Sequence, residues 1–259
     1  MSKLSLKLKS SNFTDFVNKL QDLSQIDDTI KIKLESEKTL IYSMISNDVS
    51  VLALKSYSIN TKDYFENFTK EETVDFIITS SGKFVKNLKF FNTEKSIKLD
   101  LVCKPMPEND SILHVRSAQF SNEKLKISCI GGEQFKIRDI NLIVLSTRLN
   151  PKLSKWNFKI SRTDFSDVKK LSSINSEEKT LYINVSSNKV TMSEPSKWEL
   201  EIDEINHKNE QLIFNKKYFS NINDNGDMIQ FIIFESFILI KDDISNLMLS
   251  FETNFDTED

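Results

Sequence analysis

The sequence predicts an α+β protein made of two similar halves. Three observations lead to this fold class: most apolar residues alternate with polar ones, four segments follow helical spacing instead, and the order of these elements recurs in the second half of the chain. With 259 residues, the chain is long enough for two domains that each bury a core. Antiparallel sheets that are covered on one face account for the alternation.

The alternation has the period of two that is typical of half-buried strands. It begins with Leu4, Leu6 and Leu8, which are separated by Ser and Lys. We expect further strands at residues 30–34, 40–44, 73–78, 97–101, 125–129, 156–160, 181–185, 190–192, 210–214, 229–233, 237–240 and 247–251.

Four segments have their apolar residues on one helical face and are predicted helices. They lie at residues 13–23, 84–91, 163–173 and 218–222. Ser11 or Asn12 is the expected cap of the first helix, and Thr163 or Asp164 that of the third, because short polar side chains satisfy the first free N–H groups.

The two halves align when the sequence is shifted by 151 or 152 residues. The larger shift places Leu4, Leu6 and Leu8 on Trp156, Phe158 and Ile160. The smaller shift aligns Val17, Leu20, Leu23, Ile30, Ile32 and Leu34 with Val168, Leu171, Ile174, Leu181, Ile183 and Val185. A duplicated unit is the economical interpretation, and two unrelated α+β domains are the alternative.

A linker is predicted between the halves, because a proline cannot continue a central strand. Pro151 follows Leu149 and Asn150 in this stretch. We therefore expect an N-terminal domain at residues 1–139, a connecting segment at 140–155 and a C-terminal domain at 156–259.

Composition narrows the class of protein. The net charge of −3 argues against a basic coat over the whole surface, although it allows a basic region confined to one face. The longest apolar block, residues 228–240, is too short and too polar for a membrane span, and the N-terminus lacks a signal-peptide core. Cys103 and Cys129 are expected to be buried free thiols, so we predict an intracellular protein.

The sequence offers no catalytic residue, metal site or cofactor loop. His114 and His207 lie in different halves and lack the neighbouring Cys or carboxylates of a zinc site. Gly131 and Gly132 are a lone pair rather than a phosphate-binding loop. We therefore predict a protein that is not an enzyme, and a hydrolase whose site has no sequence motif is an alternative.

Four segments resemble the DNA sliding-clamp family, which includes proliferating cell nuclear antigen and the clamps of tailed bacteriophages. Residues 43–51, SMISNDVSV, look like the segment Ser-Met-Asp-Ser-Ser-His-Val-Ser-Leu of the eukaryotic clamp. The start of the second domain around Phe158 and Phe165, the strand and helix at 212–219, and the last strand at 247–251 are also similar to that family.

The resemblance implies a non-enzymatic, homotrimeric ring whose six domains place helices inside and sheets outside. Such a ring encircles double-stranded DNA without sequence preference and tethers a DNA polymerase, after a clamp loader places it. Asp48 stands where the eukaryotic clamp has His, and Glu252-Thr253 replace its Ala-Pro, so the resemblance favours a divergent viral or bacteriophage clamp in the host cytoplasm. A subunit of a heteromeric ring is an alternative within the same family.

The lysines of the predicted helices are the candidate DNA-facing residues, since ammonium groups bind phosphates without reading bases. For any one lysine a solvated helix face is the ordinary explanation; their recurrence on all four helices favours a functional one. The candidates are Lys19, Lys83, Lys86, Lys89, Lys169, Lys170, Lys216 and Lys217.

The family's partner-peptide pocket beside the linker implies a second set of candidates. By resemblance they are Met44, Val49, Leu149, Pro151 and Phe251. Ordinary core packing is the alternative for Met44 and Val49. A non-enzymatic viral interaction or structural protein, built from the same duplicated unit, is the alternative function.

Overall fold

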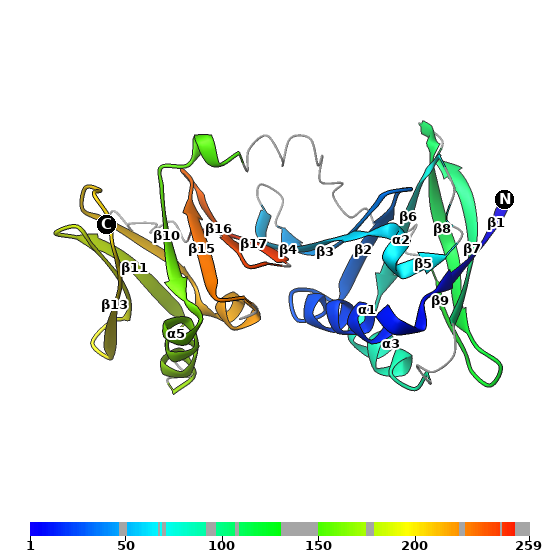
Figure 1. The fold of residues 1–259 in the computed structure, drawn as a ribbon, viewed down its shortest axis with the longest axis horizontal. Helices are drawn as coiled ribbons and strands as arrows, with labels where there is room; N and C mark the ends of the chain where they lie inside the picture. The colour runs from blue at the N-terminus through cyan, green and yellow to red at the C-terminus, as the bar shows by residue number, and fades with distance from the viewer. Residues whose placement is uncertain are drawn as a thin grey trace, which may run out of the picture. The chain divides into compact units, whose positions relative to one another are not determined.

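The structure is a computed structural model that describes residues 1–46, 51–66, 68, 71–91, 97–106, 109–130, 150–174, 179–222, 226–243 and 245–251. The chain divides into two compact units (Figure 1). Unit 1 comprises Met1–Ile45 with Lys55–Arg138, and unit 2 comprises Ser46–Leu54 with Asp139–Asp259. Both units consist mainly of antiparallel strands with a few helices, which confirms the predicted α+β class.

Unit 1 contains two runs of antiparallel strands that are joined by a parallel step. One run has the order β4-β3-β2-β6, the other β1-β7-β8-β9, and residues 73–75 of β6 pair in parallel with 112–114 of β8. The elements are β1 (Ser2–Leu8), α1 (Ser10–Leu23), β2 (Thr29–Leu34), β3 (Lys38–Ser46), β4 (Val51–Asn60), α2 (Thr61–Tyr64), β5 (Phe65–Glu66), β6 (Thr73–Thr79), α3 (Ser81–Leu88), β7 (Ile97–Met106), β8 (Asn109–Ser121) and β9 (Lys126–Ile130).

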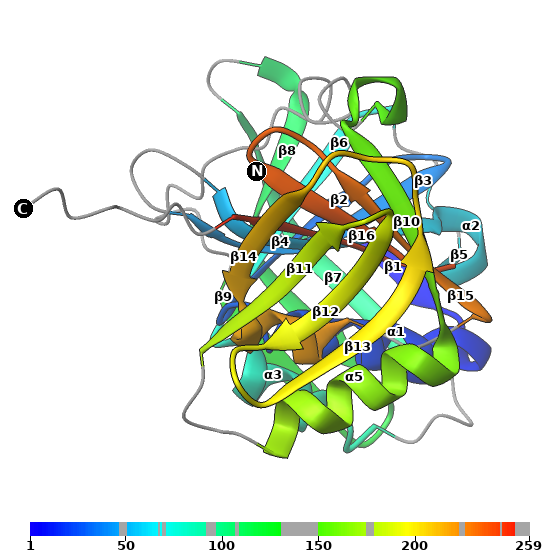
Figure 2. The same ribbon diagram turned by 90° about the vertical axis from the view of Figure 1, so that its left-hand side faces the viewer.

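Unit 2 also contains two antiparallel runs, β10-β15-β16-β17 and β13-β12-β11-β14. Figure 2 shows the second run face on, with α5 beside it. The elements are η1 (Pro151–Leu153), β10 (Trp156–Ser161), α5 (Arg162–Ile174), β11 (Thr180–Ser186), β12 (Lys189–Glu194), β13 (Trp198–Glu204), β14 (Glu210–Asn215), η2 (Lys216–Asn221), β15 (Met228–Ile233), β16 (Phe237–Lys241) and β17 (Ser245–Ser250).

The order of elements in unit 2 repeats that of unit 1. The run β1-β7-β8-β9 corresponds to β10-β15-β16-β17, and β4-β3-β2-β6 corresponds to β13-β12-β11-β14. Helix α1 corresponds to α5, and α3 to the 3₁₀ helix η2. Helix α2 and strand β5 have no counterpart among the described residues of unit 2.

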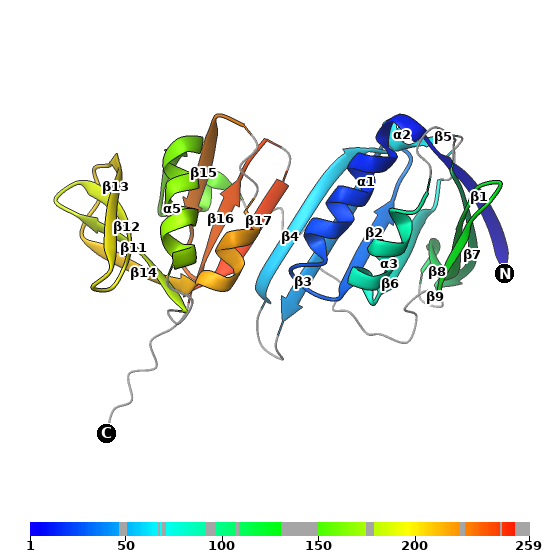
Figure 3. The ribbon, with the colours of Figure 1, turned by 90° about the horizontal axis from the view of Figure 1, so that it is seen from below.

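The helices share a core with the strands of their own unit. In unit 1, α1 and α3 lie side by side (Figure 3), and the rings of Phe13 and Phe91 meet edge to face at 5.9 Å between centroids. In unit 2, Phe158 stacks on Phe231 at 4.7 Å, and Phe165 and Phe219 pack at 5.1 Å. These aromatic contacts fix the face that each helix turns toward its sheet.

The predicted helix caps were wrong. Helix α1 begins at Ser10 with Lys9 before it and no side-chain cap. At the start of α5, Ser161 Oγ accepts from the backbone N–H of Asp164 at 3.1 Å and donates to the Asp164 carboxylate at 2.6 Å. The cap therefore lies two residues earlier than the predicted Thr163, and the Asp164 side chain supports it instead.

Candidate nucleic-acid interface and partner site

Three exposed lysines lie on α3 and directly after its last residue. Phe84, Val85 and Leu88 are buried against the core, which leaves Lys83 and Lys86 on the opposite side of the helix. Lys89 follows the last helical residue, and its ammonium group donates to the Gln21 side chain. Residues 80–91 contain no Asp or Glu, so all charged side chains of this segment are basic.

Helix α1 presents a different surface, because its lysine is buried. Lys19 is 9% exposed, and its ammonium lies 2.6 Å from Asp15 Oδ1. It also lies above the rings of Tyr57 and Tyr64, 5.5 and 5.8 Å from their centroids. Burial, together with a hydrogen bond to Asp15, raises the pKa of Tyr64. Lys19 thus belongs to a neutralised network, and this geometry argues against its predicted contact with a phosphate.

The candidate lysines of unit 2 are in mixed environments. Lys170 is exposed, although its ammonium lies 2.9 Å from Asp167 on the same helix. Lys169 is half-buried and donates to the Ile222 carbonyl.

The two lysines of η2 differ in the same way. Lys216 pairs with Glu194 at 2.7 Å, and their side chains are 13% and 0% exposed. The Glu194 carboxylate therefore neutralises the charge of Lys216 within the fold. Lys217 is exposed and lies over the Tyr218 ring at 5.7 Å. Lys170 and Lys217 are the candidates in unit 2 that reach solvent.

The structure describes only part of the predicted peptide pocket. Met44, near the end of β3, and Phe251, directly after β17, are both half-buried. Val49 and Leu149 lie outside the described residues, as does the side chain of Pro151, which begins η1. The assignment of these residues to a pocket stays a prediction.

Unit 2 contains an apolar row that sequence reasoning missed. Ile232 pairs with Leu239, and Leu239 pairs with Met248, so their side chains lie in one row across β15, β16 and β17. Because Phe231 packs toward α5, this row occupies the other face of the strands, yet its members are only 1–7% exposed. The sequence does contain a signal for this row: runs of consecutive apolar residues at 231–234, 238–240 and 247–249 indicate strands that are buried on both faces.

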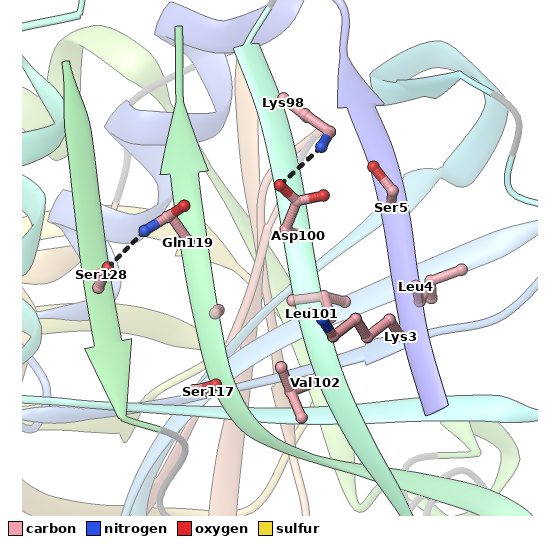
Figure 4. Close-up of a pocket in the computed structure, with 11 residues that line it drawn as sticks. Lys3, Leu4, Ser5, Lys98, Asp100, Leu101, Val102, Ser117, Gln119 and Ser128 are labelled. Atoms are coloured by element: carbon pink, nitrogen blue, oxygen red, sulfur yellow. Dashed lines mark hydrogen bonds and ion pairs between the residues drawn. The ribbon is translucent and has the colours of Figure 1, made fainter. Parts of the chain in front are cut away.

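A depression of about 470 Å³ lies on unit 1, over β1, β7, β8 and β9 (Figure 4). Lys98 pairs with Asp100 at 2.9 Å, and Gln119 donates to Ser128 at 3.1 Å. Burial alone would raise the pKa of Asp100, but hydrogen bonds from Lys98 and Ser5 outweigh it and lower the pKa. These groups satisfy one another and form no recognisable catalytic arrangement.

Two further features of the described residues bear on function. They contain no cluster of three His, Cys, Asp or Glu side chains that could hold a metal ion. Among the helices that the structure describes, none has the length and apolar character needed to cross a bilayer.

The fold is that of the DNA sliding clamps, as solved structures with the same architecture show. The Helicobacter pylori beta clamp bound to a DNA ligase peptide has a TM-score of 0.67 and 16% identity, with 96% of this chain and 65% of that chain covered. The beta subunit of DNA polymerase III from Pseudomonas aeruginosa has a TM-score of 0.66 and 7% identity, with 98% and 66% covered. The PCNA2–PCNA3 complex from Sulfolobus tokodaii has a TM-score of 0.59 and 12% identity, with 96% and 99% covered.

The chain thus spans about two thirds of the bacterial clamps and nearly all of the Sulfolobus chain. At these identities the likeness shows the fold alone. No protein-family model matches the sequence, and no curated protein is similar to it by sequence.

Proposed function

We propose that the protein is a sliding clamp, a ring that encircles duplex DNA and holds a DNA polymerase on it. The observation that carries this proposal is the clamp fold over nearly the whole chain, combined with a helix face in unit 1 that is basic and free of carboxylates. Its activity would be mechanical rather than catalytic.

The lysines of α3 would contact the sugar–phosphate backbone. Ammonium groups on long side chains attract phosphates at any sequence, and exposed positions allow them to exchange one phosphate for the next. Lys83 and Lys86 meet this requirement, and Lys89 is exposed beside the uncharged Gln21 side chain. Lys170 and Lys217 are weaker contributors, because Lys170 pairs with Asp167 and Lys217 lies over the Tyr218 ring. Binding of this kind favours sliding, because no base-specific hydrogen bond fixes the protein in place.

Ring closure would use the unpaired strand edges β9 and β13. Among the described strands, β9 pairs with β8 alone and β13 with β12 alone. Exposed strand edges pair readily with another chain. Lys124 and Lys126 lie at β9, whereas Glu199 and Glu201 lie on β13, so the two edges carry opposite charges.

A head-to-tail contact between such edges generates a ring when its rotation closes, and three chains of two units each would supply the six units. We propose a homotrimer. A heteromeric ring remains the second candidate, because the Sulfolobus structure is a complex of PCNA2 with PCNA3. Strand β11 offers no free edge, since it lies between β12 and β14.

The partner site would use half-buried Phe251, which follows directly after β17. Ile232, Leu239 and Met248 are only 1–7% exposed, so they belong to the core of unit 2 rather than to the contact surface. A partly exposed aromatic side chain favours a short peptide with aromatic or aliphatic anchors. The Helicobacter pylori beta clamp was solved with a DNA ligase peptide, which supports a polymerase or clamp-loader peptide here.

The test is charge reversal on α3. Lys83→Glu, Lys86→Glu and Lys89→Glu together should weaken binding to a duplex oligonucleotide, measured by fluorescence anisotropy over a salt series. Each lost phosphate contact should reduce the slope of log affinity against log salt by about 1. A control variant reverses three exposed lysines of other elements, Lys3, Lys62 and Lys208, for the same change in net charge. Equal loss in both variants would contradict the α3 assignment.

The alternative is an interaction protein that uses the same fold without DNA. It predicts no measurable binding to duplex DNA by the unmodified protein even at low salt. The anisotropy series therefore separates the two functions.

A further inference from the structure

Phe90 is an exposed aromatic residue in the turn that follows α3. Its side chain is 78% exposed, whereas the neighbouring Phe91 is 4% exposed and packs against Phe13. The backbone N–H of Phe90 donates to the Asn87 carbonyl and that of Phe91 to the Leu88 carbonyl, both at 3.1 Å. The ring is therefore presented to solvent by a hydrogen-bonded turn.

The surroundings of Phe90 are basic. Lys83 and Lys86 lie three residues apart on α3, and Lys89 and Phe90 follow its last residue, Leu88. The Asp28 carboxylate contacts the opposite end of α3, where it accepts a hydrogen bond from the backbone N–H of Gly82 at 3.4 Å. Residues 80–91 contain no Asp or Glu, and an aromatic ring flanked by cations matches the combination that binds single-stranded nucleic acid.

We propose that these four residues, called here the α3 patch, bind single-stranded DNA. The proposal rests on the proposed function, since it requires DNA to reach α3. The lysines attract phosphates of single and double strands alike. The ring distinguishes them, because bases inside a duplex cover each other's faces and an unpaired base leaves a face open for stacking.

The α3 patch would therefore prefer a place where duplex gives way to single strand, such as the end of a primer. Duplex alone would engage Lys83, Lys86 and Lys89 and leave Phe90 in water. An unpaired base next to the duplex would cover the exposed ring as well, so both kinds of contact form together.

The experiment compares binding of the full chain to a short oligothymidylate and to a blunt duplex of equal length by fluorescence anisotropy. Phe90→Ala should weaken oligothymidylate binding about tenfold, within the range for loss of one stacked base, and leave duplex binding unchanged. Phe90→Trp should retain binding, because it keeps an aromatic face. Leu153→Ala, which removes another exposed apolar side chain (63% exposed), is the matched control and should change neither affinity.

The outcomes separate this inference from the proposed function. If α3 charge reversal abolishes duplex binding while Phe90→Ala binds oligothymidylate like the unmodified protein, the ring makes no contact and only this inference fails. If the unmodified protein binds neither DNA, both fail. A loss with Phe90→Ala that Phe90→Trp does not restore would show that stacking is not the interaction, and would also overturn it.

Discussion

At the scale of single residues, the molecule keeps several charges away from solvent and pairs each one. Lys31 and Asp75 are 4% and 2% exposed and lie 3.0 Å apart, with His114 Nδ1 3.6 Å from the same carboxylate oxygen. In unit 2, Lys216 and Glu194 form a similar buried pair. Water would solvate such charges far better than a protein core does, so each member depends on its partner.

Removal of one member of the Lys31–Asp75 pair should therefore be strongly destabilising. Lys31→Met leaves a buried carboxylate whose second oxygen, Oδ1, already has no hydrogen-bond partner. We expect a loss of about 3–5 kcal/mol in the free energy of unfolding, measured by urea denaturation and circular dichroism. The double variant Lys31→Met, Asp75→Leu should recover a large part of that loss, because it removes both charges.

The control for this prediction is the exposed pair Lys7–Glu66, whose side chains are 49% and 37% exposed. Lys7→Met should change the free energy of unfolding by less than about 1 kcal/mol, since surface pairs contribute little. If the two single variants lose equal stability, the buried pair does not have the role assigned to it.

A second prediction concerns pH and Glu210. Burial alone would raise the pKa of this carboxyl, but donation from Trp156 Nε1 at 2.7 Å, His207 at 3.0 Å and Lys155 at 3.4 Å lowers it. Because the pKa is lower in the folded state, these contacts stabilise the fold above the ordinary value of 4.5, and the benefit disappears as pH falls through the folded pKa.

Glu210→Gln should therefore lower stability at neutral pH by about 1.5–3 kcal/mol and flatten its decline below pH 4.5. Urea denaturation followed by tryptophan fluorescence reports on this site directly, since Trp156 donates to Glu210. Glu66→Gln, in the exposed pair with Lys7, is the control and should leave the acid limb unchanged. A Glu210→Gln protein with an unaltered pH profile would contradict the assignment.

At the scale of elements, the sequence predicted most strands because one covered face imposes the alternation. Strand β4 was missed, since Lys55 occupies a core-facing position between Ala53 and Tyr57 and hides the apolar period. Lys55 is fully buried there because its ammonium lies 2.6 Å from Asp22 of α1. Strand β13 was missed for another reason. It is an edge strand with no fully buried residue, so its sequence lacks a clear alternation of apolar and polar residues.

The candidate site was predictable only where local sequence decides exposure. Lys83 and Lys86 are exposed because the apolar stripe of their own helix faces the core. Lys19 has the same kind of spacing, but Tyr57 and Tyr64, distant in sequence, cover it. Lys216 is buried by Glu194 in the same way. Contacts between distant segments decide these cases, and helical periodicity contains no information about them.

The end of α3 gives a prediction from two adjacent residues of the same type. Phe91→Ala should lower the free energy of unfolding by about 3–5 kcal/mol, because it opens a cavity beside Phe13. Phe90→Ala should change it by less than about 0.5 kcal/mol, since that ring is in solvent. Thermal and urea unfolding would measure both. Equal destabilisation would mean that Phe90 is part of the core rather than of the α3 patch.

At the scale of the whole molecule, β9 in unit 1 and β13 in unit 2 are each paired on one side only among the strands that the structure describes. Pairing between β9 of one chain and β13 of the next would satisfy the free backbone groups of both edges. The opposite charges of Lys124 and Lys126 against Glu199 and Glu201 would favour this pairing over β9 with β9 or β13 with β13. Such an arrangement is heterologous, so it would generate a ring, where its rotation closes, rather than a twofold dimer.

Light scattering coupled to gel filtration should therefore give about three times the chain mass of 30.0 kDa. Reversal of Lys124 and Lys126 to Glu should shift the protein to monomer, because like charges then face each other across the contact. Adding Glu199→Lys and Glu201→Lys to the same chain should restore the larger species, while Lys159→Glu on β10 should leave the mass unchanged. A monomeric unmodified protein at high concentration, or a reversed chain that stays assembled without its compensating partner, would exclude closure through these edges.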